Sequence, residues 1–135
     1  MVIDVSAAIS QAVPSQASEA SDAFFAQAAP PYITHPIFAL ELRNALTKLE
    51  RRRIIDAAES DMAIGLIESA IEFRPWRNQS EEMSQILNVA RKENLSFYDA
   101  SYLDLAAREG FHLVTRDGPL LEAAHRRGVP VHDLR

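Results

Sequence analysis

The chain has 135 residues, 47% of them hydrophobic and 24% charged, which is ordinary composition for a globular protein with one core. Without cysteine it has neither disulfides nor thiolate metal sites, and its net charge of −5 argues against a broad basic face that grips nucleic acid non-specifically. No apolar run reaches the roughly 18 residues that span a bilayer, and no basic segment precedes the N-terminal apolar run, so we expect a cytoplasmic protein that does not contact a membrane.

The first part of the chain predicts two short strands and two short helices. Met1–Val5 is an apolar run with β-branched residues, typical of a buried strand that Asp4 interrupts near its end. Ser6 is the predicted N-cap of a helix that Pro14 ends, and Ser18–Gln27 is a second, alanine-rich helix. A second strand is predicted at Tyr32–Thr34.

The most regular element is a predicted amphipathic helix over Pro36–Arg52. Glu41, Asn44 and Lys48 form a polar strip along the edge of its apolar face. A second helix is predicted over Ile54–Phe73, and the short connection indicates an antiparallel helical hairpin. The apolar face consists of Phe38, Leu42, Ala45, Leu46 and Leu49.

Two further helices are predicted before residue 110. The first begins at Asn78 or Ser80 and ends at Asn94. In the second, Ser96 and Asp99 resemble a capping box, and Asp99 begins the buried stripe. Asp104 lies about 140° around that helix from Asp99, so we expect it to point away from Asp99, as a surface acid rather than an interface residue.

The C-terminal part predicts a strand at Phe111–Thr115, a helix at Pro119–Arg127 and a last strand at Val129–Val131. Strands that alternate with helices over short loops indicate an α/β domain with a mainly parallel sheet. The few scattered glycines exclude a P-loop and a dinucleotide fingerprint.

Four carboxylates occupy positions where such a sheet binds ligands. Asp4 and Asp117 fall at or just past strand ends, Asp99 opens a helix, and Glu41 lies early in another. Carboxylates brought together raise one another's pKa unless cations compensate them. Hard oxygen ligands of this kind suit Mg²⁺ or Mn²⁺, and the chemistry that follows is metal-assisted hydrolysis of a phosphodiester.

Four segments also carry a resemblance to a known family: MVIDVSAAI, LELRNAL, LSFYDASYLDLAAREG and LVTRDGPL. In this order and spacing they resemble the PIN-domain ribonucleases, and more narrowly the VapC-type toxins of bacterial toxin–antitoxin pairs. That family has an acid at the end of its first strand, a hydroxyl residue two positions later, and E-x-x-N-A, Y-D-A and T-x-D segments. The matching residues are Asp4, Ser6, Glu41, Asn44, Ala45, Tyr98, Asp99, Ala100, Thr115 and Asp117.

The resemblance implies a single PIN-like domain over residues 1–135, with three α/β/α layers, four to five short strands in a mainly parallel sheet, and a protruding helical hairpin. It implies an endoribonuclease that uses Mg²⁺, with Mn²⁺ as a substitute, and that acts on RNA as a homodimer and is blocked by a VapB-type antitoxin. The acids Asp4, Glu41, Asp99 and Asp117 are then both the catalytic and the metal-binding residues, with Ser6, Asn44 and Thr115 in support.

Each acid also has a local interpretation. Asp99 is explained equally well as a capping residue, Asp117 as a turn or cap residue, and Glu41 as a solvated helix residue. Asp4 is hardest to explain in this way, because an acid inside a buried strand is uncommon. The joint pattern therefore favours one metal site over four separate explanations.

Other residues and functions stay open at this stage. The scattered histidines indicate surface or structural roles, Arg51–Arg53 a solvated helix end, and Trp76 a partly buried residue, a subunit contact or an RNA-stacking residue. The rival functions are a phosphatase or phosphoacceptor on a similar sheet, and a non-catalytic partner-binding module. A dehalogenase-type phosphatase needs D-x-D after the first strand, where this chain has Asp4-Val5-Ser6.

Overall fold

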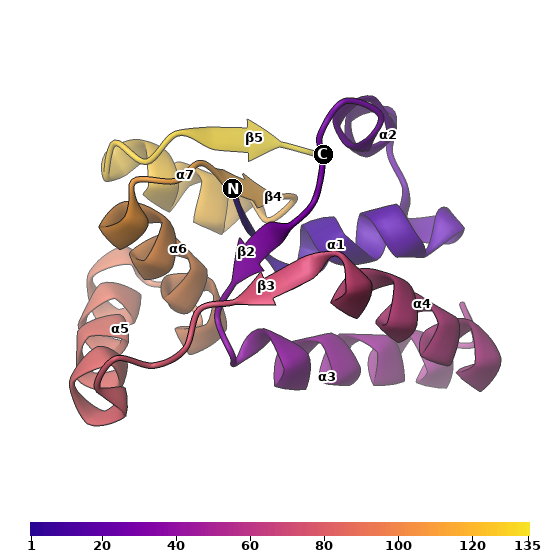
Figure 1. Ribbon diagram of the computed structural model, residues 1–135, viewed down its shortest axis with the longest axis horizontal. Coiled ribbons are helices and arrows are strands. Elements are labelled where there is room, and N and C mark those ends of the chain that lie inside the picture. The colour runs from indigo at the N-terminus through magenta and orange to yellow at the C-terminus, as the bar shows by residue number, and fades with distance from the viewer.

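The computed structural model describes residues 1–135 and contains a five-stranded sheet in which every neighbouring pair is parallel (Figure 1). The strand order is β3-β2-β1-β4-β5. The α/β class predicted from the sequence is confirmed, and the sheet is wholly rather than mainly parallel. The strands are β1 (Val2–Ile3), β2 (Tyr32–Thr34), β3 (Ile71–Phe73), β4 (Leu113–Thr115) and β5 (Val131–Asp133).

Helices cover both sides of the sheet: α1 to α4 gather on one side and α5 to α7 on the other (Figure 1). α3 runs outward from the sheet and α4 returns to it, which forms the predicted antiparallel hairpin. No helix of the chain is long and apolar enough to cross a bilayer. The helices are α1 (Val5–Ala12), α2 (Glu19–Phe25), α3 (Phe38–Arg51), α4 (Ala57–Ser69), α5 (Gln79–Glu93), α6 (Phe97–Glu109) and α7 (Gly118–Arg126), with a 3₁₀ turn at Pro14–Gln16.

The core lies between the sheet and its helices, and α6 is its most buried helix. Seven consecutive residues of α6, Ala100 to Ala106, are buried, because this helix packs on β1 and β4 on one side and on α5 on the other. Local signals set its ends. The Ser96 hydroxyl accepts the Asp99 backbone N–H at 3.0 Å, and Gly110 ends the helix at a φ of +68°, a conformation that glycine adopts without strain.

The N-terminal strand is shorter than predicted. β1 ends at Ile3 and α1 begins at Val5, so Asp4 caps the helix and Ser6 does not. The Asp4 side chain accepts the Ala7 N–H at 2.8 Å, which satisfies a donor that the first helical turn leaves free. Asp4 therefore lies between the strand and the helix and not inside the strand. The predicted N-cap, Ser6, was wrong by two residues.

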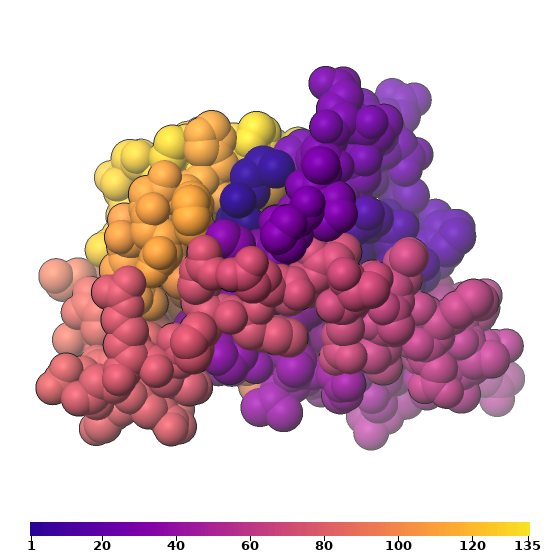
Figure 2. All heavy atoms as spheres, in the orientation of Figure 1, coloured from indigo at the N-terminus to yellow at the C-terminus, as the bar shows by residue number.

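The second helix of the hairpin was also predicted too long. Asp56 caps α4, which ends at Ser69, and the predicted helical residues 71–73 instead form β3, the edge strand paired with β2. The last strand lies two residues later than predicted, at Val131–Asp133, because Val129 still closes the turn after α7 through its N–H and the Ala124 carbonyl at 2.9 Å. In the space-filling view the atoms of α4, β3 and α5 form a band across the lower part of the molecule (Figure 2).

The order of the strands creates one switch point. From β1 the chain continues outward to β2 and β3, and from β4 it continues to β5 on the opposite side. The carboxyl ends of β1 and β4 therefore flank the position where successive crossovers diverge, which is where open parallel sheets bind ligands. Asp4 follows β1 and Asp117 follows β4 by two residues.

Candidate functional site

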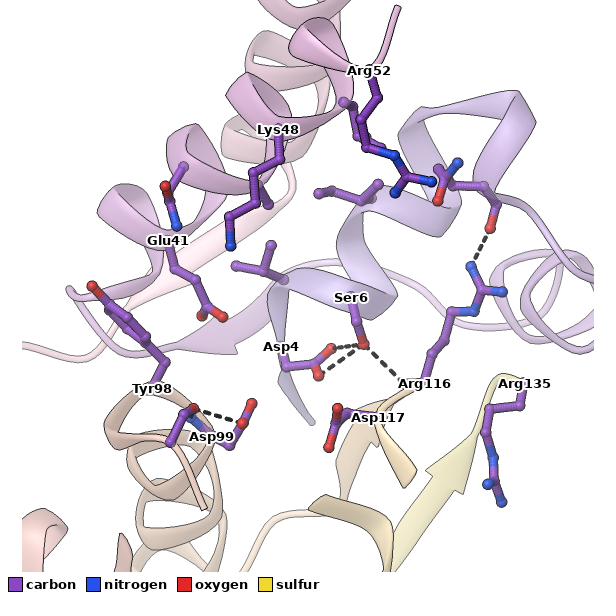
Figure 3. Close-up of a pocket in the computed structure, with 17 residues that line it drawn as sticks. Asp4, Ser6, Glu41, Lys48, Arg52, Tyr98, Asp99, Arg116, Asp117 and Arg135 are labelled. Atoms are coloured by element: carbon purple, nitrogen blue, oxygen red, sulfur yellow. Dashed lines mark hydrogen bonds between the residues drawn. The ribbon is translucent and has the colours of Figure 1, made fainter. Parts of the chain in front are cut away.

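A cavity of about 690 Å³ lies at this switch point, and all four predicted acids line it (Figure 3). Asp4 comes from the end of β1, Glu41 from α3, Asp99 from the first turn of α6 and Asp117 from the segment after β4. Residues separated by more than a hundred positions are thus brought together. Of the three predicted supporting residues, Ser6 and Asn44 also line the cavity, whereas Thr115 is buried behind Asp4.

Asp4 is the most enclosed of the acids, with 2% of its surface exposed. Both of its oxygens lie 2.9 Å from the Ser6 hydroxyl, and the Thr115 hydroxyl donates to Oδ2. Ser6 and Thr115 hold the loop after β4 as well, because their hydroxyls accept the N–H groups of residues 116 and 117, both at 2.9 Å. Burial raises the pKa of Asp4 to about 6 despite these hydrogen bonds.

Glu41 is positioned by a residue that the sequence did not single out. The Tyr102 hydroxyl of α6 donates to Glu41 Oε2. Burial, together with the nearby carboxylates of Asp99 and Asp4, raises the pKa of Glu41 to about 7 against the opposing effects of this hydrogen bond and of Lys48. Tyr102 lies three residues after Asp99 on the same helical face, a spacing that predicted burial but gave no sign of a contact with α3.

Asp99 and Asp117 each form a hydrogen bond at the N-terminus of a helix and also line the cavity. The Ser96 hydroxyl donates to Asp99 Oδ2 at 2.6 Å, and Asp117 caps α7 by accepting the Leu120 N–H at 2.8 Å through Oδ1. Burial raises the pKa of Asp99, and the nearby Asp117 carboxylate adds to the increase. The capping interpretation of both residues is correct, and it is compatible with their place at the cavity.

The three outer acids share a pattern of hydrogen bonding. Glu41, Asp99 and Asp117 each use one oxygen for a hydrogen bond inside the protein, and the other oxygen has no protein partner. As the side chains stand, no three of them form a group compact enough to hold an ion. The unpartnered oxygens are nevertheless hard donors, and their mutual repulsion is what a divalent cation would offset.

Four cationic side chains line the same cavity: Lys48 and Arg52 of the α3 side, and Arg116 and Arg135 of the sheet side (Figure 3). The sequence placed Lys48 on the polar strip of its helix and Arg51–Arg53 at a solvated helix end. All three of those arginines are exposed, but Arg52 alone among them lines the cavity. The site therefore combines an acidic floor with a basic wall, although the whole chain is acidic.

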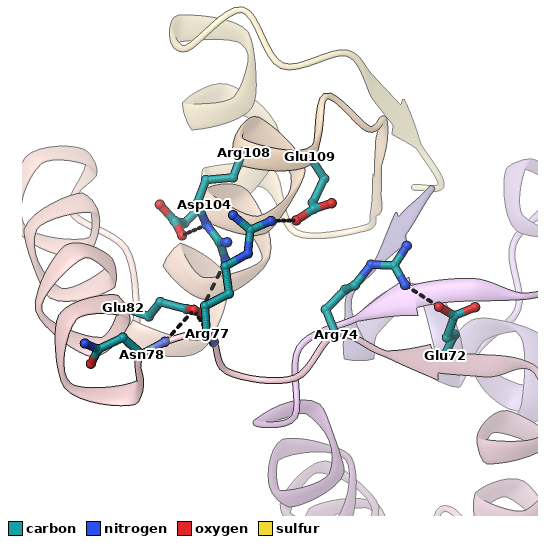
Figure 4. A network of polar contacts seen from close by, with 8 residues as sticks. All are labelled: Glu72, Arg74, Arg77, Asn78, Glu82, Asp104, Arg108 and Glu109. Atoms are coloured by element: carbon teal, nitrogen blue, oxygen red, sulfur yellow. Dashed lines mark hydrogen bonds and ion pairs between the residues drawn. The ribbon is translucent and has the colours of Figure 1, made fainter.

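Asp104 was expected at the surface, and that expectation is wrong. Only 5% of it is exposed, because α5 covers this face of α6. Its Oδ2 accepts Arg108 Nε at 2.8 Å, and the same guanidinium reaches Glu82 on α5 at 3.5 Å (Figure 4). Asp104 does not line the cavity and belongs to an ion-pair network that joins α5 to α6.

Arg108→Met should destabilise the protein by about 1–3 kcal/mol and leave the cavity unchanged, because it leaves Asp104 buried without its counter-ion. The matched control is Arg77→Met, which breaks the exposed Arg77–Glu109 pair of the same network and should cost under about 0.5 kcal/mol. Urea unfolding of both variants at pH 7.5 measures the difference. Equal losses for the two variants would contradict a structural role for the buried pair.

Trp76 and His35 lie outside the cavity that the four acids line. Trp76 is partly buried and stands edge-on against the ring of His35, with ring centroids 4.0 Å apart. His35 is itself buried, and this burial lowers its pKa to about 4. Neither residue lines the cavity, and the burial of His35 fits the structural rather than the surface role, the two roles that the sequence left open.

The comparisons with known proteins agree with this fold. The family profile described as PIN domain matches residues 1–125. Ribonuclease VapC3 from Pyrobaculum aerophilum is 30% identical over 125 residues, which are 90% of this chain and 92% of that protein. The crystal structure of PAE2754 from Pyrobaculum aerophilum superposes with a TM-score of 0.69 at 25% identity, over 90% of this chain and 82% of that one. The resemblance inferred from the motifs is confirmed, and the chain belongs to the PIN-domain family.

Proposed function

We propose that this protein is a Mg²⁺- or Mn²⁺-dependent endoribonuclease that hydrolyses phosphodiester bonds of RNA. The observation that carries the proposal is the convergence of Asp4, Glu41, Asp99 and Asp117 from four separate elements on one cavity. The name of the relative, Ribonuclease VapC3, supports RNA as the substrate. The dehalogenase-type phosphatase alternative is disfavoured, because the chain has Asp4-Val5-Ser6 where that class needs D-x-D.

The donor set fits a divalent cation. All four acids offer carboxylate oxygens, and neither imidazole nor thiolate reaches the cavity, which suits Mg²⁺ or Mn²⁺ rather than a softer metal. Burial raises the pKa values of Asp4, Glu41 and Asp99, and neighbouring carboxylates add to the increase, so a bound cation would favour the ionised form of all three. We assign these three residues and Asp117 as the metal ligands.

When bound, the cation supplies a more acidic water molecule and offsets the charge that develops on the phosphodiester. The chain's own groups hold the ligands in place. Ser6 and Thr115 fix the Asp4 carboxylate by donating hydroxyl hydrogens to it, and Tyr102 fixes Glu41. Asn44, one turn after Glu41 on α3, presents an amide at the cavity that can hydrogen-bond water or substrate.

We further propose that the ribonuclease is the cytoplasmic toxin of a toxin–antitoxin pair, that it acts as a homodimer, and that a VapB-type antitoxin occludes the cavity. The support is the relative's name and the resemblance of the motifs. A short protein encoded beside this chain should bind it and stop RNA cleavage. Undiminished cleavage in the presence of that neighbour's product would contradict the partnership.

The decisive experiment incubates total cellular RNA with the parent protein, with Asp99→Asn and with the control Asp61→Asn, an exposed acid of α4 outside the cavity. We expect cleavage by the parent and the control in Mg²⁺ or Mn²⁺, loss of cleavage in EDTA, and at least a hundredfold slower cleavage by Asp99→Asn. Mapping the cut ends identifies the bond. Equal cleavage by Asp99→Asn and the parent would overturn the proposal.

A further inference from the structure

One face of α3 passes from acidic to basic along the wall of the cavity (Figure 3). Glu41, Asn44, Lys48 and Arg52 follow one another at spacings of three or four residues, which place them on a single face of a helix. With a rise of about 1.5 Å per residue, Lys48 lies about 10 Å and Arg52 about 16 Å along the axis from Glu41. The charge along this face therefore changes from negative at Glu41 to positive at Lys48 and Arg52.

The four cations of the cavity are not equally available to a ligand. Arg116 donates to the backbone carbonyl of Gln16, and Arg135 forms a forked pair with Asp133, with contacts of 2.7 to 3.2 Å. Lys48 and Arg52 form neither a hydrogen bond nor an ion pair through their side chains with any residue of the chain. The two cationic side chains without any partner in the chain therefore both lie on the α3 side of the cavity.

We propose that Lys48 and Arg52 bind backbone phosphates of the RNA, so that the strand extends from the acids along α3 toward the loop between α3 and α4. This inference rests on the proposed function and assigns its substrate path. An acidic chain must supply local positive charge to hold a polyanion near four carboxylates, and these two side chains supply it. Arg52 lies farther along α3 from the acids than Lys48, which extends toward Glu41 (Figure 3), so Arg52 governs binding rather than the chemical step.

The test measures binding without cleavage. The parent for binding is the Asp99→Asn protein, and Lys48→Met and Arg52→Gln are each added to it separately. Each protein is titrated into a fluorescently labelled single-stranded RNA at NaCl concentrations from 50 to 200 mM. Arg51→Gln is the matched control: it removes the same charge from the adjacent position of the same helix, but Arg51 does not line the cavity. Thermal unfolding of each variant checks that the fold is retained.

We expect Lys48→Met and Arg52→Gln each to weaken RNA binding by about three- to tenfold. Each should also make the negative slope of the logarithm of the association constant against log[NaCl] shallower by about 0.7, while Arg51→Gln changes neither quantity. In protein that retains Asp99, Arg52→Gln should raise KM and leave kcat within about twofold. Equal binding by Arg52→Gln and its parent, or an equal loss in Arg51→Gln, would overturn the proposed path.

The two proposals fail separately. Cleavage that survives Asp99→Asn contradicts the proposed function, whereas cleavage that depends on Asp99 but not on Lys48 or Arg52 contradicts only the path along α3. A parent protein that does not bind the RNA at any of these salt concentrations contradicts the path as well.

Discussion

Asp4→Asn should reduce RNA cleavage by roughly 10²- to 10⁴-fold while the protein stays folded. Asparagine keeps the shape of the side chain, and its Oδ1 can still accept the Ala7 N–H that Asp4 accepts at 2.8 Å. The hydroxyls of Ser6 and Thr115 can rotate to meet the new amide, because a hydroxyl both donates and accepts. The change therefore removes the charge from the cavity and little else.

The same substitution should stabilise the metal-free protein at high pH. Folding raises the pKa of Asp4 from 3.8 to about 6, so the folded state binds a proton more tightly than the unfolded state. The ionised carboxylate therefore weakens stability progressively as the pH rises from about 4 to about 6, and the loss is complete above that range. Asp4→Asn should gain about 1–3 kcal/mol over the parent at pH 8 in EDTA and almost nothing at pH 4.

Urea unfolding of variant and parent at each pH measures this gain. The comparison cancels the opposite contribution of His35, whose lowered pKa makes stability rise with pH from about 4 to about 6.5. The matched control is Asp56→Asn, which makes the same change at the exposed N-cap of α4 and should affect neither cleavage nor the pH dependence. A destabilised Asp4→Asn at pH 8, or one with parental cleavage, would contradict the assignment.

The positions of the acids were predictable because they coincide with local signals. Asp4 and Asp117 are N-caps, and Asp99 lies in the first turn of α6. Three of the four acids thus stand at the positive ends of helices, where the backbone N–H groups and the helix dipole favour a negative charge. The local preference that made a capping role plausible also reduces the cost of keeping these carboxylates charged at the cavity.

What the sequence did not disclose depends on contacts between distant segments. Residues 71–73 continue the apolar pattern of the preceding helix, and only pairing with β2 makes them a strand. Asp104 has the helical position of a surface residue, and it is buried only because α5 packs over it and Arg108 neutralises it. Tyr102 gives no sequence signal of its bond to Glu41, since the partner lies 61 residues away.

The sequence also could not show which of the arginines line the cavity and which of them are bound by other residues of the chain. Arg51, Arg52 and Arg53 are consecutive, and a net charge of −5 argued against a basic surface. The helix phase at the end of α3 turns one of the three toward the cavity, and only the folded geometry shows that Arg116 and Arg135 are engaged by the chain itself. A composition average hides such a local basic wall beside an acidic floor.

Divalent cations should stabilise the protein at pH 8 and much less at pH 5. Protons compete with a metal ion for carboxylates, and the pKa of Asp4 is about 6 and that of Glu41 about 7 in the metal-free protein. At pH 5 both acids are largely protonated, so the cation must displace protons to bind. At pH 8 both are ionised, and a cation relieves their repulsion as well as gaining ligands.

The shift can be measured as a thermal unfolding midpoint in EDTA and in Mn²⁺ or Mg²⁺. At 10 to 100 times its dissociation constant, a ligand that binds only the folded state stabilises it by about 1.4–2.7 kcal/mol, which corresponds to a rise in Tm of roughly 4–12 °C for a chain of this size. Glu41→Gln should lose most of the rise at pH 8, whereas Asp61→Asn, on the exposed face of α4, should keep it. Equal rises at pH 5 and pH 8, or a full rise in Glu41→Gln, would show that the cation binds elsewhere. A rise that depends on both pH and Glu41 would place the metal at this cavity independently of any measurement of RNA cleavage.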